Sequence, residues 1–157
     1  MAVVVKYGSG YKDPAAIKAA DAIFAEASMK AINSQITITN GDSIASNYFV
    51  GRVPSNAIIA PVAEYRNQAI AGVTSFSLGF AAAGAQLVSA VSLAVASALG
   101  VGVNAMVAVP LANLNQKAWQ LAGLSSDPGG MLDIVATINA AATATGVVTF
   151  TIPYSRK

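Results

Sequence analysis

The chain has 157 residues, a length typical of one domain, and 55% of them are hydrophobic while only 10% are charged. It contains no histidine and no cysteine, which excludes serine–histidine and cysteine–histidine triads, disulfides and thiolate chemistry. The net charge of +2 is too small, and the basic residues too scattered, to predict a nucleic-acid partner. Because soluble monomers usually carry about 25% charged residues, we expect either a membrane or a protein partner to cover much of the surface.

The first 33 residues predict an arm followed by a helix. Residues 1–12 combine a short β-prone run with a Gly-Ser-Gly hinge, which predicts an extended arm. In residues 13–33 the apolar side chains recur at spacings of three and four, with Asp13 placed as N-cap and Pro14 at the first helical position. Residues 1–157 contain no internal repeat and no charged linker, so we predict a single domain.

From Ser34 the hydrophobic period changes from helical to two, which predicts strands. The first strand runs into the turn signal Asn-Gly-Asp at 40–42. Further strands are predicted over 48–53, over 57–65, where Pro61 indicates an edge or a bulge, and over 74–80.

Residues 81–109 fit both helical spacing and strict alternation, so the sequence leaves helix and strand open there. They belong to a run of fifty residues, 67–116, that has no formal charge. The window Gly79–Val103 is long enough to span a bilayer, but serines and glycines dilute it and neither flank has a Lys or Arg. A transmembrane helix is therefore a disfavoured alternative.

The C-terminal part predicts a short helix and two closing strands. The helix would have Asn113 as N-cap, Gln116 in a capping box and Gly123 at its end. The strands are predicted over 132–138 and 148–152. Six or seven short strands, one or two short helices and no regular βαβ alternation predict a mainly β fold, a jelly roll or β-sandwich.

No motif in the chain predicts an enzyme, a cofactor or a metal site. The letters GVGVNA at 100–105 match a dinucleotide fingerprint, but Pro110 would end the helix that such a motif needs. Asp42 and Glu64 are the best candidates for a glycosidase-type carboxylate pair, although a turn-capping role for Asp42 is favoured. We expect Asp42, Arg52 and Asp127 to hold turns and strand ends.

Long uncharged strands leave edges and apolar surface that usually mark a protein interface. We therefore predict that the arm and the apolar middle segment make partner contacts. The candidate contact residues are Val3, Val4, Val5, Tyr7, Tyr11, Leu87, Val91, Val95, Leu99, Val101 and Val103.

Three stretches together resemble a known group of proteins. They are INSQITITNGDSIASNYFVGRVPSNAIIAPV, then TSFSLGF, then KAWQLAGLSSDPGGMLDIVATINAAATATGVVTFTIPY, and they span Ile32–Phe80 and Lys117–Tyr154. A strand into NGDS, a strand into RVPSNAII and a terminal LAGLSSDPGG loop with its hairpin occur in the order that resembles small virion proteins of tailed phages. Within that group the chain is most similar to head decoration, or cement, proteins.

The resemblance implies a jelly roll or β-sandwich without catalytic residues, which assembles as a dimer or trimer. It implies that the partner is the major capsid protein of the same virus, and that the chain, made in the host cytoplasm, lies on the capsid surface of the virion. A tail or head–tail joining protein, or the main shell subunit itself, is the first alternative, and the shell subunit is disfavoured because 157 residues is short for building a whole phage shell. A small membrane-associated protein and a carbohydrate-binding module are the others.

Overall fold

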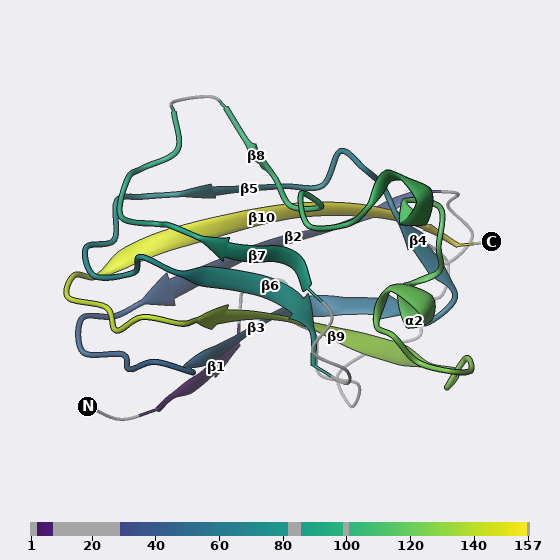
Figure 1. Cartoon of the computed structure of the whole chain (residues 1–157), viewed down its shortest axis with the longest axis horizontal. Helices are drawn as coiled ribbons and strands as arrows, with labels where there is room; N and C mark the ends of the chain where they lie inside the picture. The colour runs from purple at the N-terminus through teal and green to yellow at the C-terminus, as the bar shows by residue number, and fades with distance from the viewer. Residues whose placement is uncertain (1–2, 8–28, 82–85, 99–100, 157) are drawn as a thin grey trace, which may run out of the picture.

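The computed structural model describes residues 3–7, 29–81, 86–98 and 101–156, and they form two β-sheets packed face to face (Figure 1). The prediction of a β-sandwich is confirmed. The first sheet has the order β1 (Val5–Tyr7), β3 (Asn47–Pro54), β9 (Met131–Ile138), β6 (Phe76–Phe80), β7 (Gln86–Val91). The second has the order β2 (Lys30–Ile38), β10 (Gly146–Arg156), β5 (Glu64–Asn67), β8 (Val103–Asn104), and β4 (Ala57–Ile59) pairs with the end of β10.

Alternation of buried and exposed side chains builds β2 and most of β10. In β2, Ile36 and Ile38 are buried, while the adjacent Gln35 and Thr37 are exposed. β2 pairs with β10 in an unbroken antiparallel register from Gly146 to Tyr154. A slip of one residue would turn every isoleucine of β2 toward solvent, so the hydrophobic pattern itself fixes this register.

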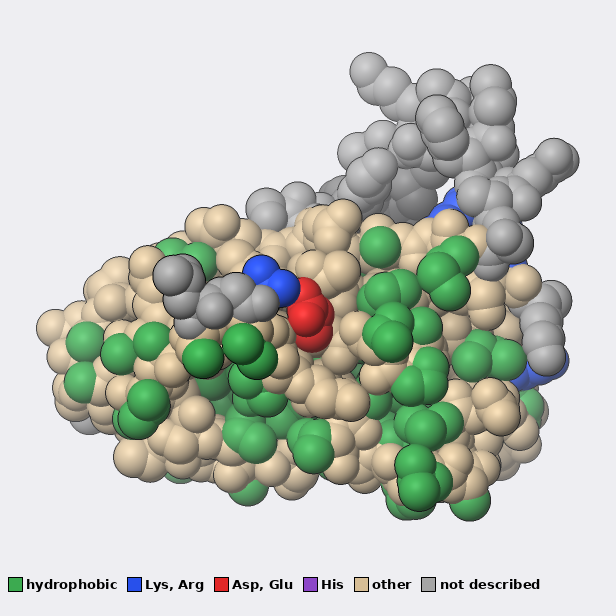
Figure 2. Space-filling view, turned by 90° about the horizontal axis from the view of Figure 1, so that it is seen from above, with side chains coloured by type: hydrophobic (Ala, Val, Ile, Leu, Met, Phe, Trp, Pro, Cys, Tyr) green, Lys and Arg blue, Asp and Glu red, His purple; other side chains and the backbone are tan. Residues whose placement is uncertain are grey.

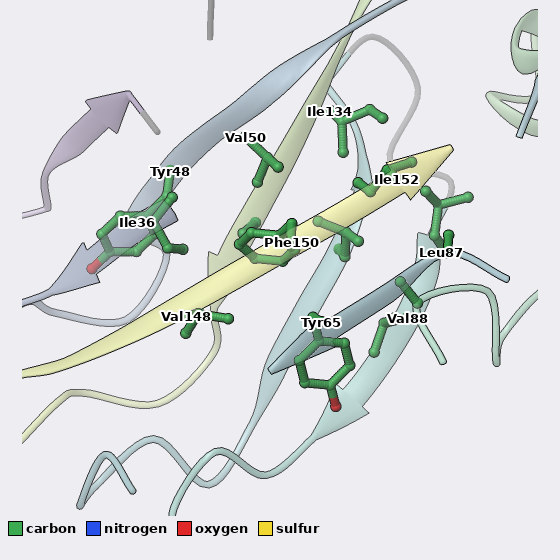
Figure 3. Close-up of a cluster of buried hydrophobic side chains, with 14 of the residues drawn as sticks. Ile36, Tyr48, Val50, Tyr65, Leu87, Val88, Ile134, Val148, Phe150 and Ile152 are labelled. Carbon is green, nitrogen blue, oxygen red and sulfur yellow. The ribbon is translucent and has the colours of Figure 1, made fainter. Parts of the chain in front are cut away.

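The core lies between the two sheets, with Phe150 of β10 at its centre. Figure 3 shows its ring among apolar side chains from both sheets. The ring centroid of Phe76 from the opposite sheet lies 6.4 Å from that of Phe150, and Tyr65 lies 5.8 Å from Phe76. Since each fully buried large apolar side chain contributes about 1.5–3 kcal/mol, this layer accounts for most of the driving force of folding.

The predicted helix over 13–33 is wrong at its end, and its first part lies outside the described residues. Lys30 to Asn33 begin β2, where Ile32 is buried opposite Ile152 of β10. Helical spacing is a weak signal, and burial in a sheet overrides it here.

Among the described residues of 81–109, only 86–91 and 103–104 are strand, and the others are turns or irregular structure. β7 pairs with β6 and β8 pairs with β5, and a 3-10 turn follows at Leu111–Asn113. With these strands, and with the 57–65 segment divided at Pro61 into β4 and β5, the described residues hold ten strands and not six or seven. No helix in the described ranges is both long enough and apolar enough to cross a membrane.

The C-terminal helix is shorter than predicted. α2 spans Ala118–Leu121, and its N-cap is Lys117, whose backbone N–H donates to Oε1 of Gln120 at 3.0 Å. The predicted cap, Asn113, instead belongs to the 3-10 turn and donates to the carbonyl of Pro110. Gly123 ends the helix as predicted, with a φ of +71° that favours glycine.

Candidate interaction surfaces

The described residues 92–98 and 101–109, called here the closing segment, lie between β7 at the edge of the first sheet and the 3-10 turn, and they include β8 at the edge of the second sheet. Leu93 and Met106 anchor it in the core. The Ala105 N–H donates to the Ala63 carbonyl at 2.8 Å, and the Ala108 N–H donates to the Leu87 carbonyl at 2.9 Å. The closing segment is therefore tied to both sheets.

Asn67, at the end of β5, fixes the path of this segment. Its side-chain amide donates to the carbonyls of Leu93 at 3.3 Å and Val95 at 2.9 Å. Its backbone N–H donates to Oγ of Ser97 at 3.0 Å, and its carbonyl accepts the Ser97 N–H. Sequence reasoning missed Asn67, because a single asparagine at a strand end has no distinctive pattern.

The outward side of the closing segment is apolar. Val95 is 77% exposed, Val101 56% and Val107 63%, and β8 adds Val103 at its edge. Figure 2 views the molecule from the side of β8 and β5 and shows hydrophobic side chains spread over that face with few charges among them. We call these four valines the valine surface. All four belong to one segment of the chain, and exposed apolar side chains on such a segment are typical of an interaction site.

Not all the predicted contact residues of the middle segment lie on the surface. Val95, Val101 and Val103 are on the surface, whereas Leu87 is only 2% exposed and fills the core. A partner contact at Leu87 therefore does not fit its position, because β7 turns this side chain between the sheets. Val91 is half-buried against the core, and Leu99 lies outside the described residues. The exposed Val107 was not predicted, although it belongs to the same uncharged run.

A groove of about 490 Å³ crosses the outer face of the first sheet. β1 and β6 form its sides and β3 and β9 its floor; it is lined by Val5, Tyr7, Asn47, Phe49, Ser77, Gly79, Phe80, Ala81, Val135, Thr137 and Asn139. The rings of Tyr7 and Phe49 stack with centroids 4.9 Å apart. No charged side chain is among these lining residues.

The predicted contacts of the arm lie at and beside this groove. Val3, Val5 and Tyr7 are exposed by 57–62%, and Val4 is half-buried. Tyr11 lies outside the described residues. The arm residues that the structure describes thus lie along the edge of β3, in parallel pairing with it.

Asp42 connects this arm to the body of the protein. Its Oδ2 accepts hydrogen bonds from the Thr39 N–H and the Tyr48 hydroxyl, and the Lys6 ammonium lies 2.9 Å away. Burial raises the pKa of Asp42, but the bonds from Tyr48, Thr39 and Lys6 outweigh it, so the pKa is lowered from its ordinary value. Burial and the neighbouring carboxylate raise the pKa of Tyr48.

The expected structural roles of three charged residues are confirmed. Asp42 closes its turn, and Arg52 forms an ion pair with Asp133 across β3 and β9. Asp127 accepts the Gly129 N–H at 2.9 Å in its loop, and hydrogen bonds from Ser55 and Gly129 lower its pKa.

The structure gives the two candidate catalytic carboxylates separate partners. Glu64 forms an ion pair with Arg66 at 2.9 Å, whereas Asp42 bonds to Lys6 and Tyr48. Across the described part of the chain, no three acidic side chains come together in a way that would hold a metal ion.

Comparison with known proteins gives one informative likeness. No protein-family model matches the chain, and a search of curated proteins finds no match. Among solved structures, the chain is similar to one in "Cyanophage Pam1 capsid asymmetric unit", with a TM-score of 0.51 and 16% sequence identity. The match covers 82% of this chain and 85% of the other. The two chains therefore have a similar length and share the fold over most of it.

Proposed function

We propose that this chain is a non-enzymatic structural protein of a phage virion, which binds the outside of an assembled head and stabilises it. The fold that it shares with a similarly sized chain of a phage capsid carries the proposal. Its partners are the major capsid protein and further copies of itself, in a dimer or trimer.

The described surfaces suit this role. The valine surface offers apolar area on a segment that is tied to both sheets, so binding requires little ordering of the chain. A lattice repeats the same binding site many times, and modest contacts of linked subunits then add through multivalency. A protein that binds only the assembled lattice stabilises that lattice by mass action. A chain without histidine also lacks the usual general base near neutral pH.

The copy number of the chain in purified particles tests the proposal. Quantitative mass spectrometry should find it at a level comparable with the major capsid protein. A far smaller number would favour the alternative of a tail or head–tail joining protein. Absence from the particle would contradict a virion role altogether.

Introducing negative charges then tests whether the valine surface makes the contact. The double variant Val95→Asp/Val101→Asp should remain folded and lose its place on the particle, because the carboxylates cannot be buried in an apolar interface. Thr37→Asp/Thr151→Asp is the matched control, since it adds the same charge to exposed positions of the second sheet. Equal copy numbers for both variants would show that the valine surface is not the binding face.

A further inference from the structure

β1 is attached to the edge of the sandwich without forming part of its interior. It pairs with β3 over three residues, in the only parallel pairing among the described strands. Val3, Val5 and Tyr7 are exposed, and none of them belongs to the core cluster. The two sheets therefore bury their core whether or not β1 comes from the same chain.

The position that β1 occupies is shaped by the rest of the molecule. We call it the edge site: the edge of β3 together with Ser46 and Asp42. The Asn47 N–H donates to the Val4 carbonyl at 3.0 Å, and Oγ of Ser46 accepts the Val4 N–H at 3.3 Å. The carboxylate of Asp42 has a side-chain exposure of only 7% and accepts Lys6.

An empty edge site would be unfavourable. It would leave the edge of β3 unpaired, and an unpaired edge invites another strand. It would also leave the buried Asp42 carboxylate without its cation, which costs free energy. The site therefore selects a short extended strand with a basic side chain at the position of Lys6.

The distance along the chain allows the strand to come from elsewhere. Residues 8–29 separate β1 from β2. A connection of that length can reach roughly 70 Å when extended, at 3.3–3.6 Å per residue. A folded chain of this size has a radius of gyration on the order of 15 Å, so the connection can extend to a neighbouring copy.

We propose that, in the assembled protein, the edge site of each copy binds residues 3–7 of a second copy. This inference rests on the proposed assembly of the chain into a homo-oligomer. Exchange of an identical strand keeps every contact of the edge site and joins the two subunits through those same non-covalent contacts, so it costs little. The groove is then completed by two chains, with Val5 and Tyr7 from one and Phe49 from the other.

Engineered cysteines test the exchange directly, because the natural chain has none. Val5 and Asn47 are partners in the register of β1 and β3, and both line the groove. Two full-length chains with tags of different size, one carrying Val5→Cys and the other Asn47→Cys, are produced together and oxidised. Exchange predicts a covalent dimer of the two tagged chains on a non-reducing gel.

The matched control uses a strand pair inside the sandwich. Gln35 and Thr149 are exposed partners of β2 and β10, so single variants Gln35→Cys and Thr149→Cys, mixed in the same way, should give no specific mixed dimer. The double variant Val5→Cys/Asn47→Cys in one chain reports whether the strand is bound at all. The proposal would be overturned if the double variant forms its disulfide within one chain while the single variants give no mixed dimer.

The outcome is independent of the test of the proposed function. Mixed dimers from a chain that is absent from particles would leave the exchange standing and remove the virion role. If the chain is present in particles but the disulfide of Val5→Cys/Asn47→Cys forms only within one copy, the virion role stands and the exchange is overturned.

Discussion

The four long strands β2, β3, β9 and β10 and the closing segment are built in different ways. In β2 and β10, polar and apolar residues alternate, and the register continues without a break from Gly146 to Tyr154. The closing segment consists largely of alanine, valine and serine, pairs through only two residues in β8, and relies on Asn67 for its position. Alternation encodes which side of a strand is buried, whereas uniform small apolar residues leave that choice to the surrounding structure.

The difference extends to what each region exposes. The second sheet turns polar, uncharged residues such as Gln35 and Thr149 toward solvent. The closing segment exposes valines. We infer that the long strands serve the stability of the sandwich and that the closing segment is free to serve binding, because its exposed side chains contribute little to the core.

The largest expected effect is in the centre of the core. Phe150→Ala should lower the free energy of unfolding by about 3–5 kcal/mol, since it removes a buried aromatic ring and leaves a cavity. Urea denaturation measures the loss. Thr149→Ala, at the exposed neighbouring position, should change stability by less than about 0.5 kcal/mol. A similar loss for both variants would contradict the assignment of the two faces of β10.

Asn67→Ala should destabilise the protein by about 1–3 kcal/mol, because it leaves the buried carbonyl of Leu93 and the partly buried carbonyl of Val95 without this donor. Hydrogen exchange should speed up at residues 93–98 and stay slow in β2 and β10. Asn33→Ala, on the exposed side of β2, is the control. Uniform acceleration throughout the sandwich would show that the closing segment does not open separately.

Asp42→Asn should cost about 1–3 kcal/mol at neutral pH, because it removes the charge that holds Lys6 and Tyr48. The pKa of Asp42 is lowered in the folded chain, so between that value and the ordinary carboxyl pKa the unfolded state binds more protons. The stability that Asp42 contributes is complete above the ordinary pKa and is lost as the pH falls through the folded value.

Urea denaturation over a pH series from neutral to acid checks this dependence. The difference between the natural chain and Asp42→Asn should shrink as the pH falls. Lys6→Met should retain part of the dependence, since the bonds from Tyr48 and Thr39 remain. A difference that stays constant with pH would show that Asp42 does not act through its charge.

The smallest expected effect concerns the irregular strand β7. Ala90 has a φ of +53°, a conformation that costs a side chain about 1–2 kcal/mol and glycine almost nothing. Ala90→Gly should therefore leave stability unchanged or raise it by up to about 1 kcal/mol, measured as the shift of the urea midpoint. Ala31→Gly in the regular strand β2 should destabilise by about 0.5–1 kcal/mol. Destabilisation by both substitutions would contradict the backbone strain inferred at Ala90.

The sequence by itself determined the sandwich, because alternation at Ile36 and Ile38 and again at Val148 and Phe150 assigns each side chain to core or solvent without knowledge of the partner strand. It also determined the turn at Asp42 and the end of α2 at Gly123, where local backbone geometry requires those residues.

Only the tertiary structure decided the remaining features. Lys30 to Asn33 became strand because β10 lies beside them, and residues 86–91 became strand because β6 does. The same packing placed Leu87 inside and Val101 outside, although both belong to one uniformly apolar run. Local pattern carries no information there, because the choice between burial and exposure depends on contacts from residues far away in the sequence.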